Sequence, residues 1–355
     1  MRHGWLHAGV LSALSAALLF GASTPFAKRL VGEVPPQMLA GLLYLGSGVG
    51  LALVFAGRVA PARRPAGRVV LPSGPEWGWL AGAILFGGVI GPVLLMAGLL
   101  VTPASAASLL LNLEGVFTAL AAWFVFRENF DRRIALGMAL IVAGGVVLAW
   151  QPARTAGDWW GPLAIVGACA CWALDNNLTR KVSASDAVLI ACVKGLAAGT
   201  VNVSVAAISG QALPSATTGA LAGLLGFFGY GVSLVLFVVA LRHLGTARTG
   251  AYFSVAPFFG AVLALLLLDE PASATLVAGG VLMAAGVWLH VTERHEHEHV
   301  HEPIEHEHPH VHDEHHQHAH ELAWDGKEPH THRHAHAPLR HKHPHYPDIH
   351  HQHRH

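Results

Sequence analysis

The sequence contains few charged residues, few cysteines and no nucleotide-binding loop. Only 12% of its 355 residues are charged, and 22 basic residues balance 22 acidic ones, but this balance means little because the charges are segregated along the chain. The three cysteines, Cys169, Cys171 and Cys192, lie in apolar stretches, where we expect them to be small hydrophobic side chains rather than a disulfide framework. The pattern G-x-x-x-x-G-K-[ST] does not occur, which excludes a P-loop and ATP as the direct energy source.

Apolar residues are abundant, at 53% of the chain. They gather in runs of about 20 residues, the length that a helix needs to cross a bilayer core of about 30 Å. A soluble domain has no use for so many such runs. We therefore predict an all-α polytopic membrane protein with ten transmembrane helices, at about 8–27, 36–56, 77–100, 104–126, 132–150, 161–181, 187–208, 218–240, 247–268 and 272–291.

The stretch 80–150 returns in altered form at 222–292, which is 142 residues later. Gly87 aligns with Gly229, and Glu128 aligns with Glu270. Each copied stretch holds three predicted helices, and each full repeat to which it belongs holds five. A repeat with an odd number of helices must insert its second copy in the opposite orientation, as in the inverted repeats of secondary transporters. We predict a first repeat at 1–150, a second repeat at 151–293 and a separate tail at 294–355.

The basic residues indicate the orientation in the membrane. If the N-terminus is cytoplasmic, the segments on that side hold thirteen lysines and arginines, whereas the outer loops hold three, Lys28, Arg29 and Arg154. Cytoplasmic loops carry an excess of basic residues, so we expect an integral protein of the cell (inner) membrane with both termini in the cytoplasm. The Lys28-Arg29 pair breaks the rule locally, and it matches Arg180-Lys181 in the second copy.

Two blocks with an acidic residue just after the fourth helix of each copy identify a family resemblance. They read TPASAASLLLNLEGVFTALAAWFVFREN in the first copy and LGTARTGAYFSVAPFFGAVLALLLLDEP in the second. Across residues 8–291 the chain resembles the EamA family of the drug/metabolite transporter superfamily. The resemblance implies ten helices in inverted repeats, a central cavity, alternating access, and the export of amino acids, other metabolites or toxic compounds.

Three charged residues fall inside the predicted membrane helices: Glu114, Asp175 and Lys194. A charge at the bilayer centre costs about 3 kcal/mol or more, so such residues usually face a cavity or a partner. One interpretation is a substrate or proton site, in which Glu114 or Asp175 carries a proton because burial favours a neutral carboxyl group. The other is an Asp175–Lys194 pair that only ties two helices together. The hydrogen-bonding neighbours that we expect at the site are Asn112, Asn176, Asn177 and Asn202.

The tail holds 23 of the 27 histidines. Alternating histidines and acids with recurrent prolines leave little to bury, so we predict a disordered segment. Neutral imidazoles are ligands for zinc, nickel, cobalt or copper, and no other cofactor is expected. The predicted metal ligands are His295, His297, His299, His301, His306, His308, His310, His312, His315, His316, His318 and His320. Matches to the protease pattern His-Glu-x-x-His arise here from composition, because no stable helix or third ligand accompanies them.

These features predict a secondary transporter, and not an enzyme, that exports a small metabolite or drug-like solute. The alternatives are a carrier of divalent nickel, cobalt or zinc, and a membrane metal sensor or buffer that acts through the tail without transport. No histidine lies well inside a predicted span, which disfavours a soft-metal pathway. The expected partners are the lipid bilayer, a small-molecule solute and divalent metal ions at the tail, with no nucleic acid, and a homodimer is an open alternative to a monomer.

Overall fold

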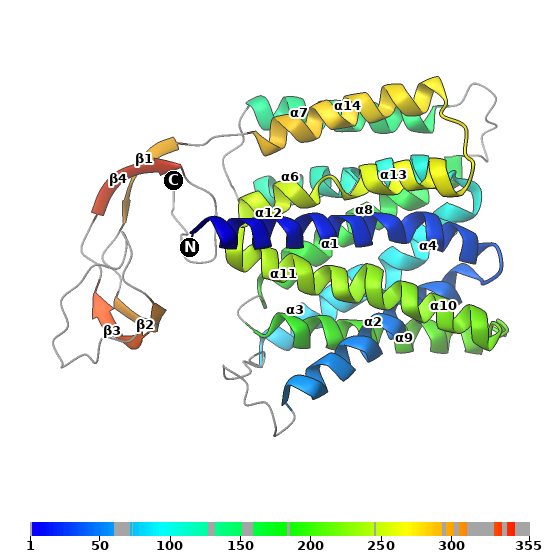
Figure 1. The fold of residues 1–355 in the computed structure, drawn as a ribbon, viewed down its shortest axis with the longest axis horizontal. Coiled ribbons are helices and arrows are strands. Elements are labelled where there is room, and N and C mark those ends of the chain that lie inside the picture. The colour runs from blue at the N-terminus through cyan, green and yellow to red at the C-terminus, as the bar shows by residue number, and fades with distance from the viewer. Residues whose placement is uncertain are drawn as a thin grey trace. The chain divides into compact units, whose positions relative to one another are not determined.

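The computed structural model describes residues 2–59, 72, 74–126, 132–150, 159–182, 185–244 and 246–292, and in the tail 296–301, 305–310, 330–335 and 339–344. The chain divides into two compact units, Met1–Glu293 and Arg294–His355. The first is a bundle of helices that run side by side along one direction (Figure 1).

The helices of the first unit follow the expected order. The first copy contains α1 (Arg2–Val31), α2 (Pro36–Val59), α3 (Glu76–Ala83), the π-helix η1 (Ile84–Ile90), α4 (Gly91–Val101), α5 (Ala104–Leu110), α6 (Leu113–Phe126) and α7 (Arg132–Ala149). The second copy contains α8 (Trp160–Arg180), α9 (Ala187–Ile208), α10 (Ala216–Gly226), the π-helix η3 (Phe227–Val232), α11 (Ser233–Leu244), α12 (Thr246–Phe253), α13 (Ala256–Leu267) and α14 (Ala274–Val291).

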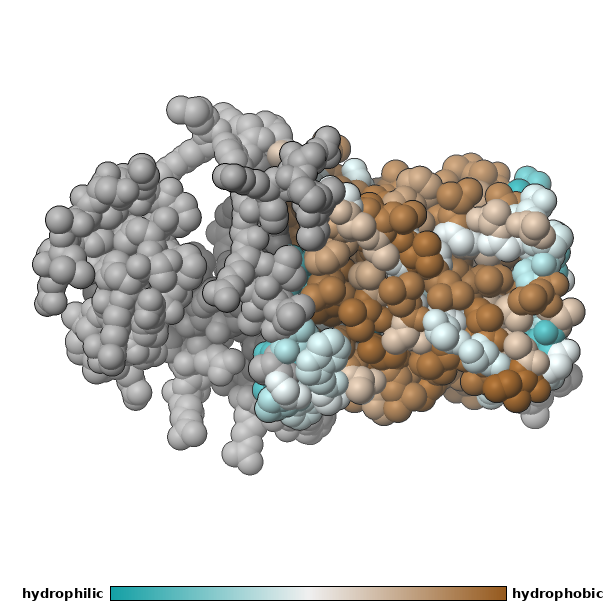
Figure 2. All heavy atoms as spheres, turned by 90° about the horizontal axis from the view of Figure 1, so that it is seen from below, coloured by the Kyte–Doolittle hydropathy of each residue, from teal (hydrophilic) through white to brown (hydrophobic). Residues whose placement is uncertain are grey.

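Seven stretches in the described part of the chain are long and apolar enough to cross a membrane. They are Ala8–Val31, Pro36–Gly57, Glu76–Val101, Ala104–Ala121, Arg132–Ala149, Val188–Ile208 and Ala216–Ala240, and Ala256–Leu267 and Ala274–Leu289 are shorter apolar helices. The polytopic helical fold is thereby confirmed, whereas the count of ten spans stays a prediction. Apolar side chains cover the outside, with Leu53 and Leu266 each 70% exposed, and Figure 2 shows the hydrophobic face that lipid would meet.

Three details differ from the predictions. Lys28 and Arg29, expected in a loop, lie in the last turn of α1, where basic side chains interact favourably with the negative end of the helix. His243, also expected in a loop, belongs to α11. The predicted helices at 104–126 and 247–268 are both broken, because α5 ends at Leu110 before α6 begins at Leu113, and α12 ends at Phe253 before α13 begins at Ala256.

Small residues bring the helices of the two copies into contact. Gly48 of α2 faces Gly195 of α9, and a Cβ atom on Gly195 would lie 2.6 Å from the backbone nitrogen of Gly48. Without a hydrophobic driving force between helices in lipid, such close backbone contact is what allows them to pack. The main buried core includes Met38, Leu39 and Leu43 of α2.

Two irregularities recur at the spacing of the repeat. The π-helix η1 of the first copy corresponds to η3 of the second, with Gly87 and Gly229 at matching positions. The break between α5 and α6 corresponds to the break between α12 and α13. The aligned Glu128 lies outside the described residues. Because broken helices line the central sites of many transporters, these paired breaks direct attention to the middle of the bundle.

The second unit contains four short strands, β1 (Glu296–His301), β2 (Glu305–His310), β3 (His330–Ala335) and β4 (Leu339–Pro344). β1 pairs with β4 and β2 with β3, both antiparallel, so that His297 is opposite His343 and His306 is opposite His334. Alternation of histidine with other residues has the period of two that a strand requires. The disorder predicted for the tail stays a prediction.

Candidate functional site

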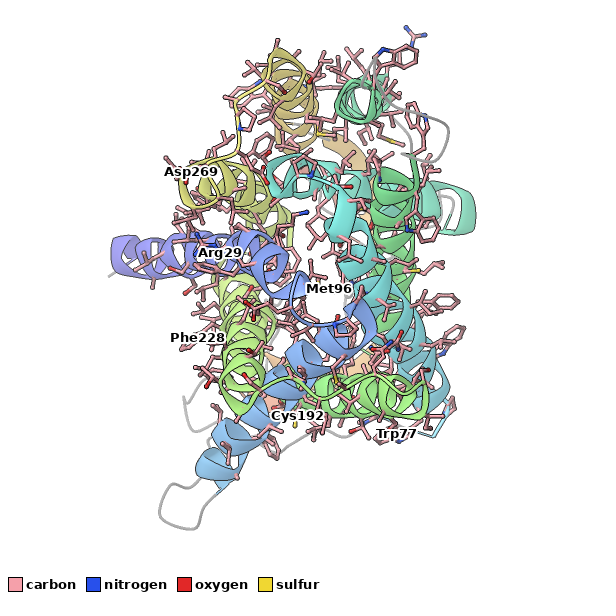
Figure 3. The ribbon with its side chains drawn as sticks, turned by 90° about the vertical axis from the view of Figure 1, so that its right-hand side faces the viewer. Arg29, Trp77, Met96, Cys192, Phe228 and Asp269 are labelled. Carbon is pink, nitrogen blue, oxygen red and sulfur yellow. The ribbon has the colours of Figure 1, made fainter. Side chains whose placement is uncertain are left out.

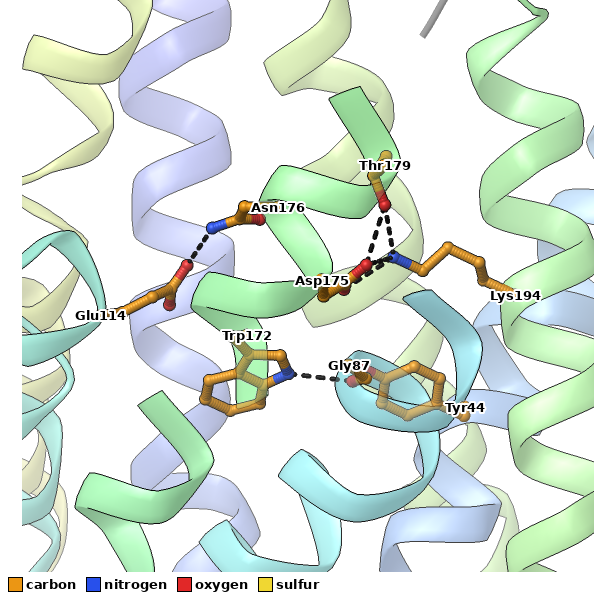
Figure 4. Close-up of polar contacts among 8 residues, drawn as sticks. All are labelled: Tyr44, Gly87, Glu114, Trp172, Asp175, Asn176, Thr179 and Lys194. Atoms are coloured by element: carbon orange, nitrogen blue, oxygen red, sulfur yellow. Dashed lines mark hydrogen bonds and ion pairs between the residues drawn. The ribbon is translucent and has the colours of Figure 1, made fainter. Parts of the chain in front are cut away.

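The polar residues of α8 form one stripe. Trp172, Asp175, Asn176 and Thr179 are spaced three and four residues apart, which places them on one face of the helix. Trp172 and Asp175 are buried, at 7% and 8% exposure, although both carry polar groups and the bundle around them is apolar. Figure 4 shows this stripe with its partners on α2, η1, α6 and α9.

Asp175 and Lys194 form an ion pair between α8 and α9. The Lys194 Nζ lies 2.5 Å from Asp175 Oδ1 and 2.7 Å from Oδ2, and the two side chains are 11% and 15% exposed. The Thr179 hydroxyl donates to Asp175 Oδ1 at 2.8 Å and accepts from Lys194 at 3.3 Å. Both charges are therefore compensated and hydrogen-bonded, as a buried pair requires.

Gly87 lies beside this pair and contacts two aromatic residues. Its carbonyl oxygen accepts from the Tyr44 hydroxyl at 2.7 Å and from Trp172 Nε1 at 2.9 Å. A Cβ atom at Gly87 would overlap the carboxylate of Asp175, so only glycine allows this close approach. Gly87 lies inside η1, and π-helical turns within α-helices frequently occur at functional sites.

Glu114 lies in the first turn of α6, directly after the break that separates α6 from α5. A negative side chain at this place is stabilised by the positive end of the helix. Its Oε1 accepts from Asn176 Nδ2 at 2.8 Å. Glu114 is partly exposed and Asn176 is exposed, and no basic side chain forms an ion pair with Glu114 within the described residues. Among the described residues, the carboxylate of Glu114 near mid-span thus has an amide as its side-chain partner.

A row of aromatic rings begins at Tyr44 and extends the site. The centroids of Tyr44 and Tyr230 are 5.5 Å apart, those of Phe20 and Tyr230 are 5.9 Å apart, and those of Phe20 and Phe253 are 5.6 Å apart. These rings come from α1, α2, η3 and α12, that is, from both copies. A carboxylate, an amide and aromatic faces together suit a small solute with a polar head and an apolar body.

Comparison with protein families shows what kind of protein carries this site. The model described as the EamA-like transporter family matches residues 7–150 and again residues 159–292. The chain belongs to this family. The two matches together span nearly the whole helical unit of the EamA-like transporter.

Curated relatives of this EamA-like transporter are similar over most of their length. An uncharacterized transporter of Methanothermobacter thermautotrophicus is 29% identical, over 81% of this chain and 87% of the relative. Probable amino-acid metabolite efflux pumps of Salmonella typhimurium and Escherichia coli are 26% and 25% identical, over 79% and 80% of this chain and 93% and 94% of theirs. One solved crystal structure, 19% identical, matches with a TM-score of 0.59 over 79% of this chain and 94% of the other, which shows the fold alone.

The structure brings together Glu114 with Asn176 and Asp175 with Lys194, but it places three predicted asparagines elsewhere. Asn112 donates to the Leu109 carbonyl, Asn177 donates to the Ala173 carbonyl of its own helix, and Asn202 donates to the Gly88 carbonyl. Their side chains stabilise irregular backbone or neighbouring helices instead of facing Glu114. Sequence reasoning missed Tyr44, Trp172 and Thr179, although the spacing from Trp172 to Thr179 around Asp175 carried a signal for the last two.

Metal coordination has no support in the helical unit. Within the described residues, no group of three or more histidine, cysteine, aspartate or glutamate side chains is arranged to hold a metal ion. Cys169 and Cys192 are buried and Cys171 is partly buried, all as free thiols. Of the predicted tail ligands, His297, His299, His301, His306, His308 and His310 belong to described strands, whereas His295, His312, His315, His316, His318 and His320 lie outside the described residues.

Proposed function

We propose that this transporter exports a small amino-acid-type metabolite from the cytoplasm by alternating access to the site around Glu114. The observation that carries the proposal is a partly exposed carboxylate near mid-span, bonded to Asn176 and without a cationic partner within the described residues. A carboxylate at this depth is costly, so such groups are rare inside membrane helices and usually mark a solute or proton pathway. Two relatives are named amino-acid metabolite efflux pumps, which supports this solute class and this direction.

The neighbouring ion pair has a different part in the proposal. Asp175 and Lys194 neutralise each other, and the carboxylate of Asp175 fills the space beside Gly87. The pair therefore positions α8 against η1 and α9. Glu114, in contrast, can exchange its amide partner for a proton or for a polar group of the solute. A coupling proton and the solute would then compete for one carboxylate.

The proposal includes the membrane in which the carrier lies, its orientation and a role for the tail. The excess of basic residues on one side favours the inner membrane with both termini in the cytoplasm. The tail would then extend into the cytoplasm and bind divalent metal as an accessory to the carrier. Metal as the cargo is not favoured, because the helical unit offers no ligand group within its described residues and the relatives are not named as metal carriers.

A tolerance screen tests the proposed function. Cells that lack the gene are complemented with the full chain or with a variant that ends at Arg294, and both are exposed to amino acids, toxic amino-acid analogues and salts of nickel, cobalt, zinc and copper. We expect the two forms to restore tolerance to the same amino-acid-type compound. Tolerance to metal salts alone, lost on truncation, would contradict the proposal and favour the tail as the functional part.

A further inference from the structure

One end of the helical unit is held together by Glu270. This residue follows α13 in the second copy, and its carboxylate accepts three hydrogen bonds from the first turn of α5 in the first copy. The donors are the backbone nitrogen of Ala104 at 2.6 Å, the backbone nitrogen of Ser105 at 2.9 Å and the Ser105 hydroxyl at 2.5 Å. The first backbone N–H groups of a helix have no partner within it, so a carboxylate from elsewhere that accepts them is a strong contact.

The backbone before Glu270 is held in a rare conformation. Asp269 has φ of 52°, in the left-handed region that side chains other than glycine seldom adopt. Strained backbone of this kind persists where the surrounding structure requires it, and it often marks a functional contact. Here it turns the chain at the end of α13 so that the next residue, Glu270, reaches α5.

Two basic residues of α1 bind backbone carbonyls at the C-terminal ends of other helices. Lys28 Nζ donates to the carbonyls of Leu99, Leu100 and Thr102, where α4 ends, with the Leu100 and Thr102 distances at 3.3 and 3.0 Å. Arg29 donates to the carbonyl of Leu267 at the end of α13. These carbonyls lack partners within their helices and carry partial negative charge. Figure 3 looks onto this end and shows Arg29 and Asp269 beside each other.

We propose that Glu270, Lys28 and Arg29 form a latch that closes the outer mouth of the carrier and must open in each transport cycle. The inference rests on the proposed function, because it assumes alternating access. Three segments from both copies, α1, the α4–α5 turn and the end of α13, are joined here by side-chain contacts to backbone groups at helix ends. Charged groups that leave such sites are hydrated by water, so the contacts can break and reform without unfolding a helix.

A reversible cross-link tests whether the outer latch must open. In a variant without the three native cysteines, Ser105→Cys and Glu270→Cys replace the closest side-chain pair of the latch. The matched control is Ser215→Cys with Thr218→Cys, two residues at the start of α10 whose hydroxyls are 3.0 Å apart within one element. We expect oxidation to reduce solute transport at least tenfold in the first variant, with recovery on reduction, and to leave the control unchanged. Full transport by the cross-linked latch would overturn the proposal.

A distance measurement decides the question even if no solute is transported. Spin labels on Val101→Cys and Ala272→Cys report the separation of the two copies at this end, since both positions are exposed and neither belongs to the latch. Glu270→Ala should lengthen and broaden the distance distribution, whereas Glu33→Ala, a change of an exposed acid at the same end, should not. An unchanged distribution in Glu270→Ala would overturn the latch. Absence of transport by the native protein would instead contradict the proposed function.

Discussion

Loss of one partner from the Asp175–Lys194 pair should lower the stability of the protein far more than loss of both charges. In Lys194→Met the carboxylate of Asp175, 11% exposed, keeps the Thr179 hydroxyl as its one side-chain partner among the described residues. Removal of one partner from a buried ion pair costs about 3–5 kcal/mol. Because both side chains retain some exposure, we expect the lower value, about 3 kcal/mol, which corresponds to a decrease in apparent melting temperature of roughly 6–10 °C.

The double variant Asp175→Asn with Lys194→Met removes both charges and keeps a hydrogen-bonding group beside Thr179. Its melting temperature should return to within a few degrees of the native protein, because no unpaired charge remains. If the pair only positions α8, solute transport should also recover to within a few-fold. The assays are thermal unfolding of the purified protein in detergent and solute uptake into everted vesicles. A double variant that is stable but inactive would refute the positional role and place the pair in the transport step.

Three further changes test other parts of the structure. Gly87→Ala should lower transport at least tenfold, because the added methyl group overlaps the Asp175 carboxylate, whereas Gly78→Ala, which meets nothing within 4 Å, should have no effect in the same assay. Gly48→Ala should destabilise the bundle by about 1–3 kcal/mol in thermal unfolding, because its Cβ would press on the backbone of Gly195 and Leu196 on α9. In nickel titrations of the full chain, His341→Ala with His343→Ala should weaken binding at least tenfold relative to His350→Ala with His351→Ala, because the strand register places the first pair opposite His299 and His297. Equal losses in the two tail variants would show that the tail binds metal without the cross-strand pairs, and binding by either should weaken below about pH 6.5 as imidazole is protonated.

The sequence predicts the membrane fold because long apolar runs have few alternative structures. It does not predict the broken helix at Phe253–Ala256 or the π-helices, because these depend on contacts between the copies rather than on local composition. The edges of α1 were also missed, since the contacts that hold Lys28 and Arg29 are backbone carbonyls of α4 and α13. A sequence does not show which backbone carbonyls will accept hydrogen bonds from a given side chain.

The residues of the site that are unusual in a membrane helix could be predicted from the sequence, and the common ones could not. Glu114, Asp175 and Lys194 stand out because charges inside apolar spans are rare. The same reasoning could not tell which asparagines belong to the site. An asparagine side chain can donate its hydrogen bond to a nearby backbone carbonyl, as Asn177 does to Ala173. Tyr44 and Trp172 resemble ordinary membrane aromatics until the Gly87 carbonyl between them is seen. Glu270 aligned across the repeat, but its role required the position of α5.

The central claim is that solute passes through a site at Glu114. The most direct test is uptake of a radiolabelled solute, taken from the tolerance screen, into proteoliposomes that contain the native protein or Glu114→Gln. Gln is similar in size and can still accept from Asn176, so the bundle should fold and insert normally. We predict that Glu114→Gln abolishes concentrative uptake while its melting temperature and yield match those of the native protein. Native rates of uptake in this variant would contradict the account.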